Sequence, residues 1–163
     1  AVITGAASGF GRAFALHAAR QRMHLVLADV DLNGLESTAL ACRELGVQVL
    51  VQPTDVASNA SVAELARRAG ETFPAVHLLF NNAGVGGGGL IWENTEADWQ
   101  WVLGVNLMGI AHGIRHFVPR MLAQEAAGQP AHVVNTASIA GWLTPPLMGV
   151  YNVSKHAVVS LSE

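Results

Sequence analysis

The chain has 163 residues and a formal net charge of −3, and 51% of its residues are hydrophobic against 13% charged, which fits one domain with a buried core and excludes a disordered tail. The basic residues are scattered and no apolar run is long enough to span a bilayer, so we expect neither a nucleic-acid nor a membrane partner. A lone cysteine, Cys42, excludes an internal disulfide and a cysteine-rich zinc site and favours the cytoplasm.

Apolar runs alternate with helical patterns along the whole chain. The expected strands cover residues 1–4, 25–28, 47–51, 76–80 and 133–135. The expected helices begin near residue 10, cover residues 32–45, 58–72 and 96–126, and begin again at Tyr151; Ser61 and Glu64 have capping-box spacing in the third of these five. This alternation predicts a single α/β domain over residues 1–163, with a doubly wound parallel sheet of the Rossmann type between two helical layers. Ligands of such sheets bind at the carboxyl ends of the strands.

A glycine-rich turn, Thr4-Gly5-Ala6-Ala7-Ser8-Gly9-Phe10-Gly11, joins the first strand to the first helix. Glycines there let a pyrophosphate approach the helix N-terminus, although tight turns also collect glycines for steric reasons. Asp29 follows Gly9 by 20 residues at the end of the second strand, where a carboxylate can bind ribose hydroxyls or begin the next helix. Its charge would repel a 2′-phosphate, and neither Val30 nor Ser8 offers a positive charge, so we expect NAD to be preferred over NADP.

The only tyrosine and the only lysine of the chain, Tyr151 and Lys155, stand four residues apart on an expected helix and therefore on one face. A neighbouring ammonium can lower the pKa of a phenol by roughly 1 to 3 units, which makes such a phenol a usable acid or base. Ser138 follows the fifth strand, where its hydroxyl could bind a substrate oxygen. Taken singly, a Tyr-x-x-x-Lys pair can arise by chance and Ser138 can be a turn residue.

Taken together and in order, these features resemble the short-chain dehydrogenases/reductases over all 163 residues. The matching segments are Thr4 to Gly11, Asp29, Asp55-Val56, Asn81-Asn82-Ala83-Gly84, Asn106, Ser138, and Tyr151 with Lys155. The resemblance implies reversible hydride transfer between NAD(H) and an alcohol or ketone, with Tyr151 as the acid/base and Ser138 orienting the substrate oxygen. It further implies that Lys155 binds the nicotinamide ribose, that Asn106 holds a water on the proton path, and that Asn81 and its neighbours stabilise the sheet.

The cofactor contacts that the resemblance implies follow the carboxyl ends of the strands, with Asp55 at the adenine. They are Gly5, Ser8, Gly9, Phe10, Gly11, Asp29, Asp55, Val56, Asn82, Ala83, Gly84, Tyr151 and Lys155.

An apolar segment between Ser138 and Tyr151 is the expected wall of the substrate pocket. Trp142 and Met148 are its candidate pocket residues, so we expect an apolar substrate; Trp142 could equally wedge against a neighbouring subunit. His112 and His116 have the spacing of zinc-binding helices, but Gly113 stands where a metalloprotease carries glutamate and no third ligand is evident, so we expect no metal.

Two other functions fit parts of the sequence. One is a dinucleotide-binding or interaction domain without turnover, against which the set of Asn106, Ser138, Tyr151 and Lys155 argues. The other is a sugar-nucleotide epimerase or dehydratase, whose G-x-x-G-x-x-G spacing differs from that of the glycine-rich turn.

The resemblance also implies a homodimer or homotetramer built on the last two helices, with faces supplied by apolar residues such as Val102, Leu107, Met108, Phe117 and Met121. Complete family members carry further strands and a substrate-covering segment, whereas this sequence stops at Glu163 within the catalytic helix. We therefore expect residues 132–136 to form a bare sheet edge, and this piece to be C-terminally incomplete and inactive by itself.

Overall fold

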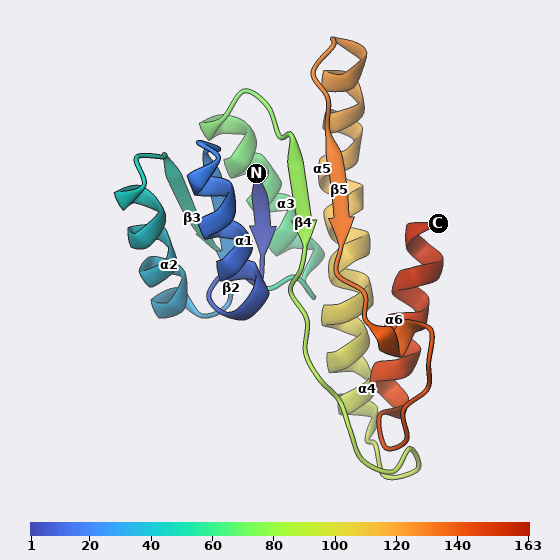
Figure 1. The fold of residues 1–163 in the computed structure, drawn as a ribbon. Helices are drawn as coiled ribbons and strands as arrows, with labels where there is room; N and C mark the ends of the chain where they lie inside the picture. The colour runs from blue at the N-terminus through green and yellow to red at the C-terminus, as the bar shows by residue number, and fades with distance from the viewer.

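Five short parallel strands form the sheet in the computed structural model, which describes residues 1–163. They are β1 (Val2–Thr4), β2 (Leu25–Asp29), β3 (Val49–Pro53), β4 (Leu78–Asn81) and β5 (His132–Asn135). Their order in space is β3-β2-β1-β4-β5, so the chain runs outward from β1 in both directions (Figure 1). The predicted doubly wound α/β fold is confirmed.

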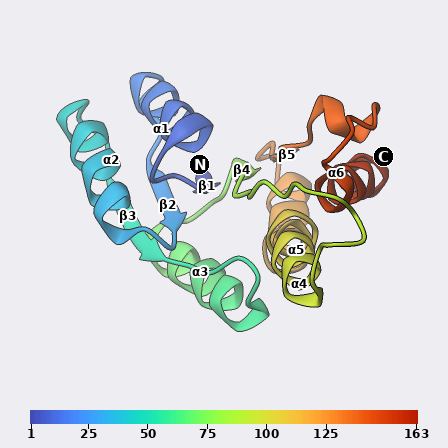
Figure 2. The same cartoon turned by 90° about the horizontal axis from the view of Figure 1, so that it is seen from below.

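Helices cover both faces of this sheet. They are α1 (Gly9–Arg20), α2 (Leu32–Glu44), α3 (Asn59–Thr72), α4 (Glu96–Leu103), α5 (Gly109–Ala126) and α6 (Gly149–Ser162). Helices α1 and α2 lie on one face and α3 and α5 on the other, while α6 packs along α4 (Figure 2). None of these helices combines the length and the apolar character that crossing a bilayer requires.

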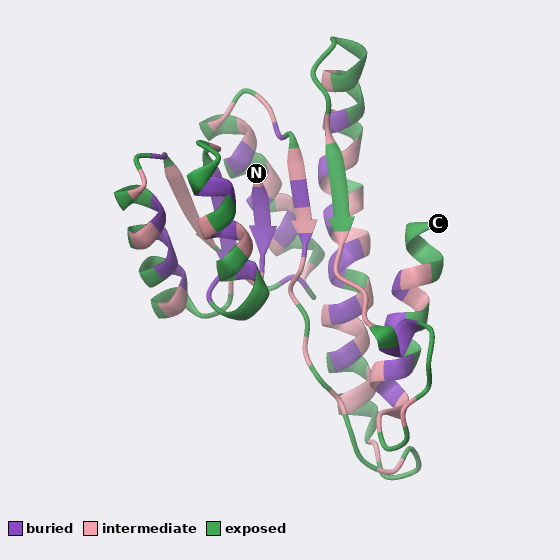
Figure 3. Ribbon diagram, viewed as in Figure 1, coloured by how far each residue is buried: buried purple, intermediate pink, exposed green.

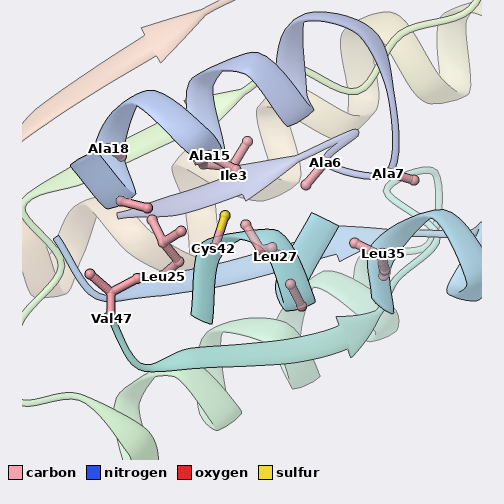
Figure 4. Close-up of a cluster of buried hydrophobic side chains, with 12 residues drawn as sticks. Ile3, Ala6, Ala7, Ala15, Ala18, Leu25, Leu27, Leu35, Cys42 and Val47 are labelled. Atoms are coloured by element: carbon pink, nitrogen blue, oxygen red, sulfur yellow. The ribbon is translucent and has the colours of Figure 1, made fainter. Parts of the chain in front are cut away.

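The central strands are buried on both faces, which explains their unbroken apolar runs. Ile3, Leu25 and Leu27 point toward α1 and α2 and pack there with Leu35 (Figure 4). Their neighbours along the strands, such as Val2 and Val26, pack instead against α3 and α5. Burial is greatest at β1 and β2, whereas β5 at the edge of the sheet is exposed, as predicted for this strand (Figure 3).

Two strands, β3 and β4, begin two residues later than predicted. Strand β3 begins at Val49, the partner of Leu25 in β2, while Val47 packs into the cluster beneath α2. Strand β4 begins at Leu78 because the side-chain amide of Gln124 binds both backbone groups of Val76, at 3.0 and 3.1 Å. A side chain from α5 thus replaces the pairing that the local apolar pattern predicted.

The cap of α3 also differs from the prediction. The hydroxyl of Ser58 accepts a hydrogen bond from the Ser61 N–H at 3.3 Å and caps the helix. The hydroxyl of Ser61 accepts one from the Asp55 N–H at 3.1 Å, and Glu64 pairs with Arg67 instead of completing a capping box. The capping box predicted for Ser61 and Glu64 was therefore wrong by one turn.

The predicted long helix over residues 96–126 is continuous but not uniform. A π-helical turn, Gly104–Met108, joins α4 to α5, and such turns often mark functional sites. Of the apolar residues expected to serve both the sheet and a partner subunit, Val102, Phe117 and Met121 are buried within the chain itself, whereas Met108 is 45% exposed.

Candidate active site

A cleft of about 1120 Å³ runs across the carboxyl ends of the strands. Its floor and walls come from the turn after β1, the ends of β2 and β3, the segments after β4 and β5, and the head of α6. Twelve of the thirteen predicted cofactor contacts line it: Gly5, Ser8, Gly9, Phe10, Asp29, Asp55, Val56, Asn82, Ala83, Gly84, Tyr151 and Lys155.

The thirteenth, Gly11, is buried in the first turn of α1 and lies outside the cleft lining. A Cβ added at Gly11 would overlap the backbone carbonyl of Gly5. Gly5 itself has a φ of +67°, and a Cβ there would lie 2.8 Å from the Cα of Ala83. These two glycines therefore let the turn pack against the first helix and the segment after β4, while Gly9 stands beside open space with a φ of +52°.

The N-terminus of α1 opens into the cleft without being neutralised. Ser8 occupies the N-cap position but makes no side-chain cap hydrogen bond, and the first turn holds no acidic residue. The free N–H groups at the start of α1 and the positive end of the dipole of this helix are therefore available to an anion.

The carboxylate of Asp29 is fixed at one end of the cleft by two backbone donors. Its oxygens accept hydrogen bonds from the N–H groups of Ala7, at 3.0 Å, and Asp31, at 3.1 Å. Asp31 is the residue that caps α2, accepting from the Gly34 N–H at 3.1 Å. Because Asp31 caps that helix, Asp29 is left facing the cleft at the end of its strand.

A hydrogen-bond network joins the ends of three neighbouring strands, β1, β4 and the edge strand β5. The hydroxyl of Thr4 accepts from the N–H groups of Asn82 and Ala83, at 2.9 and 3.0 Å, and the amide of Asn82 donates to the Thr4 carbonyl at 3.0 Å. Thr136 donates its hydroxyl proton to Asn82 at 3.2 Å, and Asn81 donates to Asn135 at 2.9 Å. The cleft floor is thereby tied to β1, β4 and β5.

Asn106 lies in the π-helical turn, completely buried and outside the cleft lining. Its side-chain amide donates to the Val85 carbonyl and to the Ser154 hydroxyl, both at 3.0 Å, and its oxygen accepts from the Val85 N–H at 2.8 Å. Both amide protons are used, so the side chain holds the segment after β4 against α6.

Tyr151, Lys155 and Ser138 line the part of the cleft beyond β5, on the other side of β1 from Asp29 at the end of β2. The ammonium of Lys155 lies 5.7 Å from the centre of the Tyr151 ring, which confirms their shared helix face. Burial lowers the pKa of Lys155 below its ordinary value, since no carboxylate compensates for the lost hydration. The Ser138 hydroxyl accepts from the Ala140 N–H at 3.1 Å, which fixes it at the start of a short turn.

The apolar wall of this end differs from the prediction. Trp142 is 68% exposed and lies outside the cleft lining, because the turn at residues 139–141 carries the chain away from the cleft. Met148 does line the cleft, together with Ile139 and Pro145.

Sequence reasoning missed other lining residues, including Thr54, Trp101 and Thr136. Thr54 and Thr136 directly follow β3 and β5, so their positions at strand ends could have indicated them. Trp101 lies on α4, and nothing in the local sequence marks it as a cleft residue.

The arrangement as a whole fits an elongated ligand with an anionic middle. A helix N-terminus lies beside the first glycines, a carboxylate able to bind hydroxyls lies at one end, and a phenol beside an ammonium group lies at the other. A dinucleotide has this chemistry and this order of groups.

Comparisons with known proteins agree with this geometry. The family model described as short chain dehydrogenase matches residues 1–163. One relative, the "CLA biosynthesis dehydrogenase/reductase" of Lactiplantibacillus plantarum, is 38% identical over 99% of this chain and 55% of its own length. Cyclohexanol dehydrogenase of an Acinetobacter species is 35% identical, over 100% of this chain and 64% of its own length.

A solved structure of a short chain dehydrogenase/reductase from Burkholderia phymatum in complex with NAD is 58% identical to this chain, with a TM-score of 0.95. The match covers 99% of this chain and 56% of that one. The chain thus spans between 55% and 64% of the length of these three relatives.

Proposed function

This chain belongs to the short chain dehydrogenase family, and we propose that it forms the cofactor-binding and catalytic part of an oxidoreductase that transfers a hydride between NAD(H) and an alcohol or ketone. The observation that carries the proposal is the single cleft in which Asp29 and the glycine-rich turn lie at one end and Ser138, Tyr151 and Lys155 at the other. NAD in the Burkholderia phymatum relative and an alcohol as the substrate named for the Acinetobacter relative support it.

The residues that would hold the dinucleotide follow from the cleft. Asp29 would accept hydrogen bonds from the adenosine ribose, and the N-terminus of α1 would bind the pyrophosphate. Lys155 would bind the nicotinamide ribose. The bound nicotinamide supplies the hydride acceptor or donor, which no side chain of this chain can replace.

The protein supplies the proton transfer. Tyr151 would take the hydroxyl proton of an alcohol as the hydride leaves, and would return a proton to a ketone oxygen in the opposite direction. The buried, positively charged ammonium group of Lys155 lies close enough to the Tyr151 ring that it would attract the phenolate form of Tyr151. Ser138, held by the Ala140 N–H, would donate its own hydroxyl proton to the substrate oxygen.

The substrate proposed for this site carries an apolar substituent next to the reacting carbon. Ile139, Pro145 and Met148 form the wall beside Tyr151, and Ile139 is 67% exposed toward solvent in the structure. Covering this surface with an apolar substituent would contribute about 25 cal/mol for each Å² buried. Activity toward secondary alcohols of increasing chain length would measure this contribution.

Tyr151→Phe tests the proposal. Turnover, followed by the absorbance of reduced nicotinamide with a panel of secondary alcohols, should fall by at least about a hundredfold because the proton donor is lost. The affinity for NADH, followed by fluorescence, should stay nearly unchanged because the hydroxyl acts on substrate. In the full-length protein, near-normal turnover by this variant would assign the chemistry to another group, and NADH binding without turnover by the unaltered full-length protein would favour a binding domain.

Two properties of the whole protein complete the proposal. The exposed Met108, on the π-helical turn between α4 and α5, is consistent with a homodimer or homotetramer, which light scattering would test. The single cysteine, Cys42, is buried and has no second cysteine with which to form an internal disulfide; we propose the cytoplasm.

A further inference from the structure

Helix α5 holds the wall of the cleft that lies beside Asp55. The ring nitrogen Nδ1 of His112 lies 2.9 Å from the carbonyl oxygen of Val56. A carbonyl oxygen can only accept, so Nδ1 carries the proton and donates it. Val56 is buried and lines the cleft next to Asp55, so this hydrogen bond ends at the backbone of the cleft wall itself.

The other anchors of this wall come from its own segment, from β2 and from the start of α3. Asp55 binds the Ala57 N–H through its carboxylate at 2.9 Å and donates its own N–H to Ser61 of α3 at 3.1 Å. These contacts join the turn to the start of α3, while the N–H of Thr54, just before the turn, donates to the Asp29 carbonyl of β2 at 2.9 Å. The bond from His112 fixes the same turn to a different helix.

The packing of α5 against this turn is also close. A Cβ at Gly109 would lie 2.8 Å from Cγ2 of Val56, so the backbone of α5 approaches the Val56 side chain directly. His112 stands one turn further along the same helix. Helix α5 therefore contacts both the side chain and the backbone carbonyl of Val56.

His116 provides a natural comparison one turn beyond His112. Its Nε2 lies 2.9 Å from the side-chain oxygen of Asn59 at the start of α3. Asn59 is exposed and does not line the cleft. Both histidines therefore link α5 to the segment that leads into α3. Only His112 contacts a residue of the cleft wall. Neither histidine belongs to a group of three side chains that could hold a metal ion.

We propose that His112 is a positioning residue for the adenosine half of the cofactor: by donating to Val56 it holds the Asp55–Ala57 turn in the place where the adenine would contact it. This inference rests on the proposed function, because it takes the cleft to be the NAD site. Losing one such hydrogen bond should weaken binding of the adenosine half roughly fivefold.

The test compares two variants of nearly equal shape. His112→Asn keeps an N–H donor near the position of Nδ1, whereas His112→Leu keeps the bulk and removes the donor. Calorimetric titration with ADP-ribose should give a dissociation constant roughly five times higher for His112→Leu, and one close to that of the unaltered protein for His112→Asn. His116→Leu, the matched control on the same helix, should leave it unchanged.

The kinetic readout separates positioning from general damage to the fold. With a secondary alcohol that the protein oxidises, His112→Leu should raise the KM for NAD while kcat at saturating NAD stays within about twofold. If His112→Leu does not fold, as judged by circular dichroism, His112→Gln, whose amide is displaced from the position of Nδ1, takes its place.

The outcomes distinguish this inference from the proposed function. Equal ADP-ribose affinity for the unaltered protein and His112→Leu, or equal losses in His112→Leu and His116→Leu, would overturn the role of His112. Failure of the unaltered protein to bind ADP-ribose at all would overturn the proposed function first.

Discussion

Lys155 donates a hydrogen bond of 2.7 Å from its buried ammonium group to the backbone carbonyl of Thr136, the first residue after β5. The contact places the only lysine of the chain at the floor of the cleft with a neutral partner, and its side chain is only 4% exposed. Burying an ammonium group without a carboxylate is costly, so this position is expected to trade stability for function.

Lys155→Met tests that trade. The substitution removes the buried charge and keeps a chain of similar length, so the melting temperature should stay equal or rise, although the Thr136 carbonyl loses its donor. Turnover and NADH affinity should both fall by at least about tenfold, because the group proposed to bind the nicotinamide ribose is gone. Thermal unfolding and NADH fluorescence measure the two effects, and a clear drop in melting temperature would contradict the first.

The pH dependence of the free energy of unfolding should also reflect the cost of burying the Lys155 ammonium group. Because burial lowers the pKa of Lys155 from its ordinary value of 10.5, the unfolded chain holds more protons on this group in the window between the lowered pKa and 10.5. The free energy of unfolding of the unaltered protein, measured relative to Lys155→Met, should therefore rise with pH through that window and stay level below it. Urea unfolding of both proteins from pH 7 to pH 10 checks this, and a relative stability that falls as pH rises would refute the sign.

Thr4→Val should weaken the floor of the cleft. The valine keeps the shape but removes the oxygen that accepts from the N–H groups of Asn82 and Ala83, in a residue that is 5% exposed. We expect a loss of about 2 to 6 kcal/mol in the free energy of unfolding, since two N–H groups lose their acceptor and each unsatisfied buried group costs roughly 1 to 3 kcal/mol.

The control for this prediction is Thr72→Val. Thr72 is exposed and its hydroxyl only donates to the Arg68 carbonyl within α3, so its loss should change the free energy of unfolding by less than about 0.5 kcal/mol. Equal effects of the two substitutions in urea unfolding would show that the hydrogen bonds of Thr4 contribute no more to the free energy of unfolding than that of an exposed hydroxyl.

Asp29 should decide between NAD and NADP. Asp29→Asn keeps the shape and one acceptor oxygen but removes the negative charge, so the ratio of NADPH affinity to NADH affinity should rise by roughly tenfold. Asp31→Asn removes the same charge two residues away, from a side chain that caps α2, and should leave the ratio nearly unchanged. Fluorescence titration of both reduced cofactors measures it, and tighter binding of NADPH than NADH by the unaltered protein would contradict the expected preference.

Much of this site was predictable because its chemistry follows the ends of strands. The glycine-rich turn, Asp29 and Ser138 each lie at the end of an apolar run or within three residues after it, and parallel strands bring such positions to one edge of the sheet. Tyr151 and Lys155 were predictable because helix spacing alone places them on one face.

What the local pattern could not supply depends on partners that are distant in the sequence. Val76 continues the apolar run of β4, yet Gln124, 48 residues further on, takes its backbone groups and delays the strand. Trp142 looked like a pocket wall by its position between Ser138 and Tyr151, but a short turn carries it outside the cleft. The bond from His112 to Val56 likewise joins residues 56 positions apart.

The last prediction separates the two kinds of glycine in the turn after β1. A Cβ at Gly11 would overlap the backbone carbonyl of Gly5, which no side-chain rotation can relieve, so Gly11→Ala should displace the turn and abolish NADH binding. Gly9 has a φ of +52° but no atom within 4 Å of the position that an added methyl group would take, so Gly9→Ala should fold with a loss of about 1 to 2 kcal/mol from the left-handed backbone alone.

Gly86→Ala is the control, since Gly86 lines the same cleft, has no positive φ and has no neighbour that a Cβ would meet. Melting temperatures should therefore fall in the order Gly86→Ala, Gly9→Ala, Gly11→Ala, with the largest step at the last. Because the steric conflict at Gly11 involves two backbone segments rather than a flexible side chain, relaxation of neighbouring side chains cannot restore the turn. A Gly11→Ala protein that melts at the same temperature as Gly86→Ala and binds NADH would show that the first helix can move away from β1 at little cost.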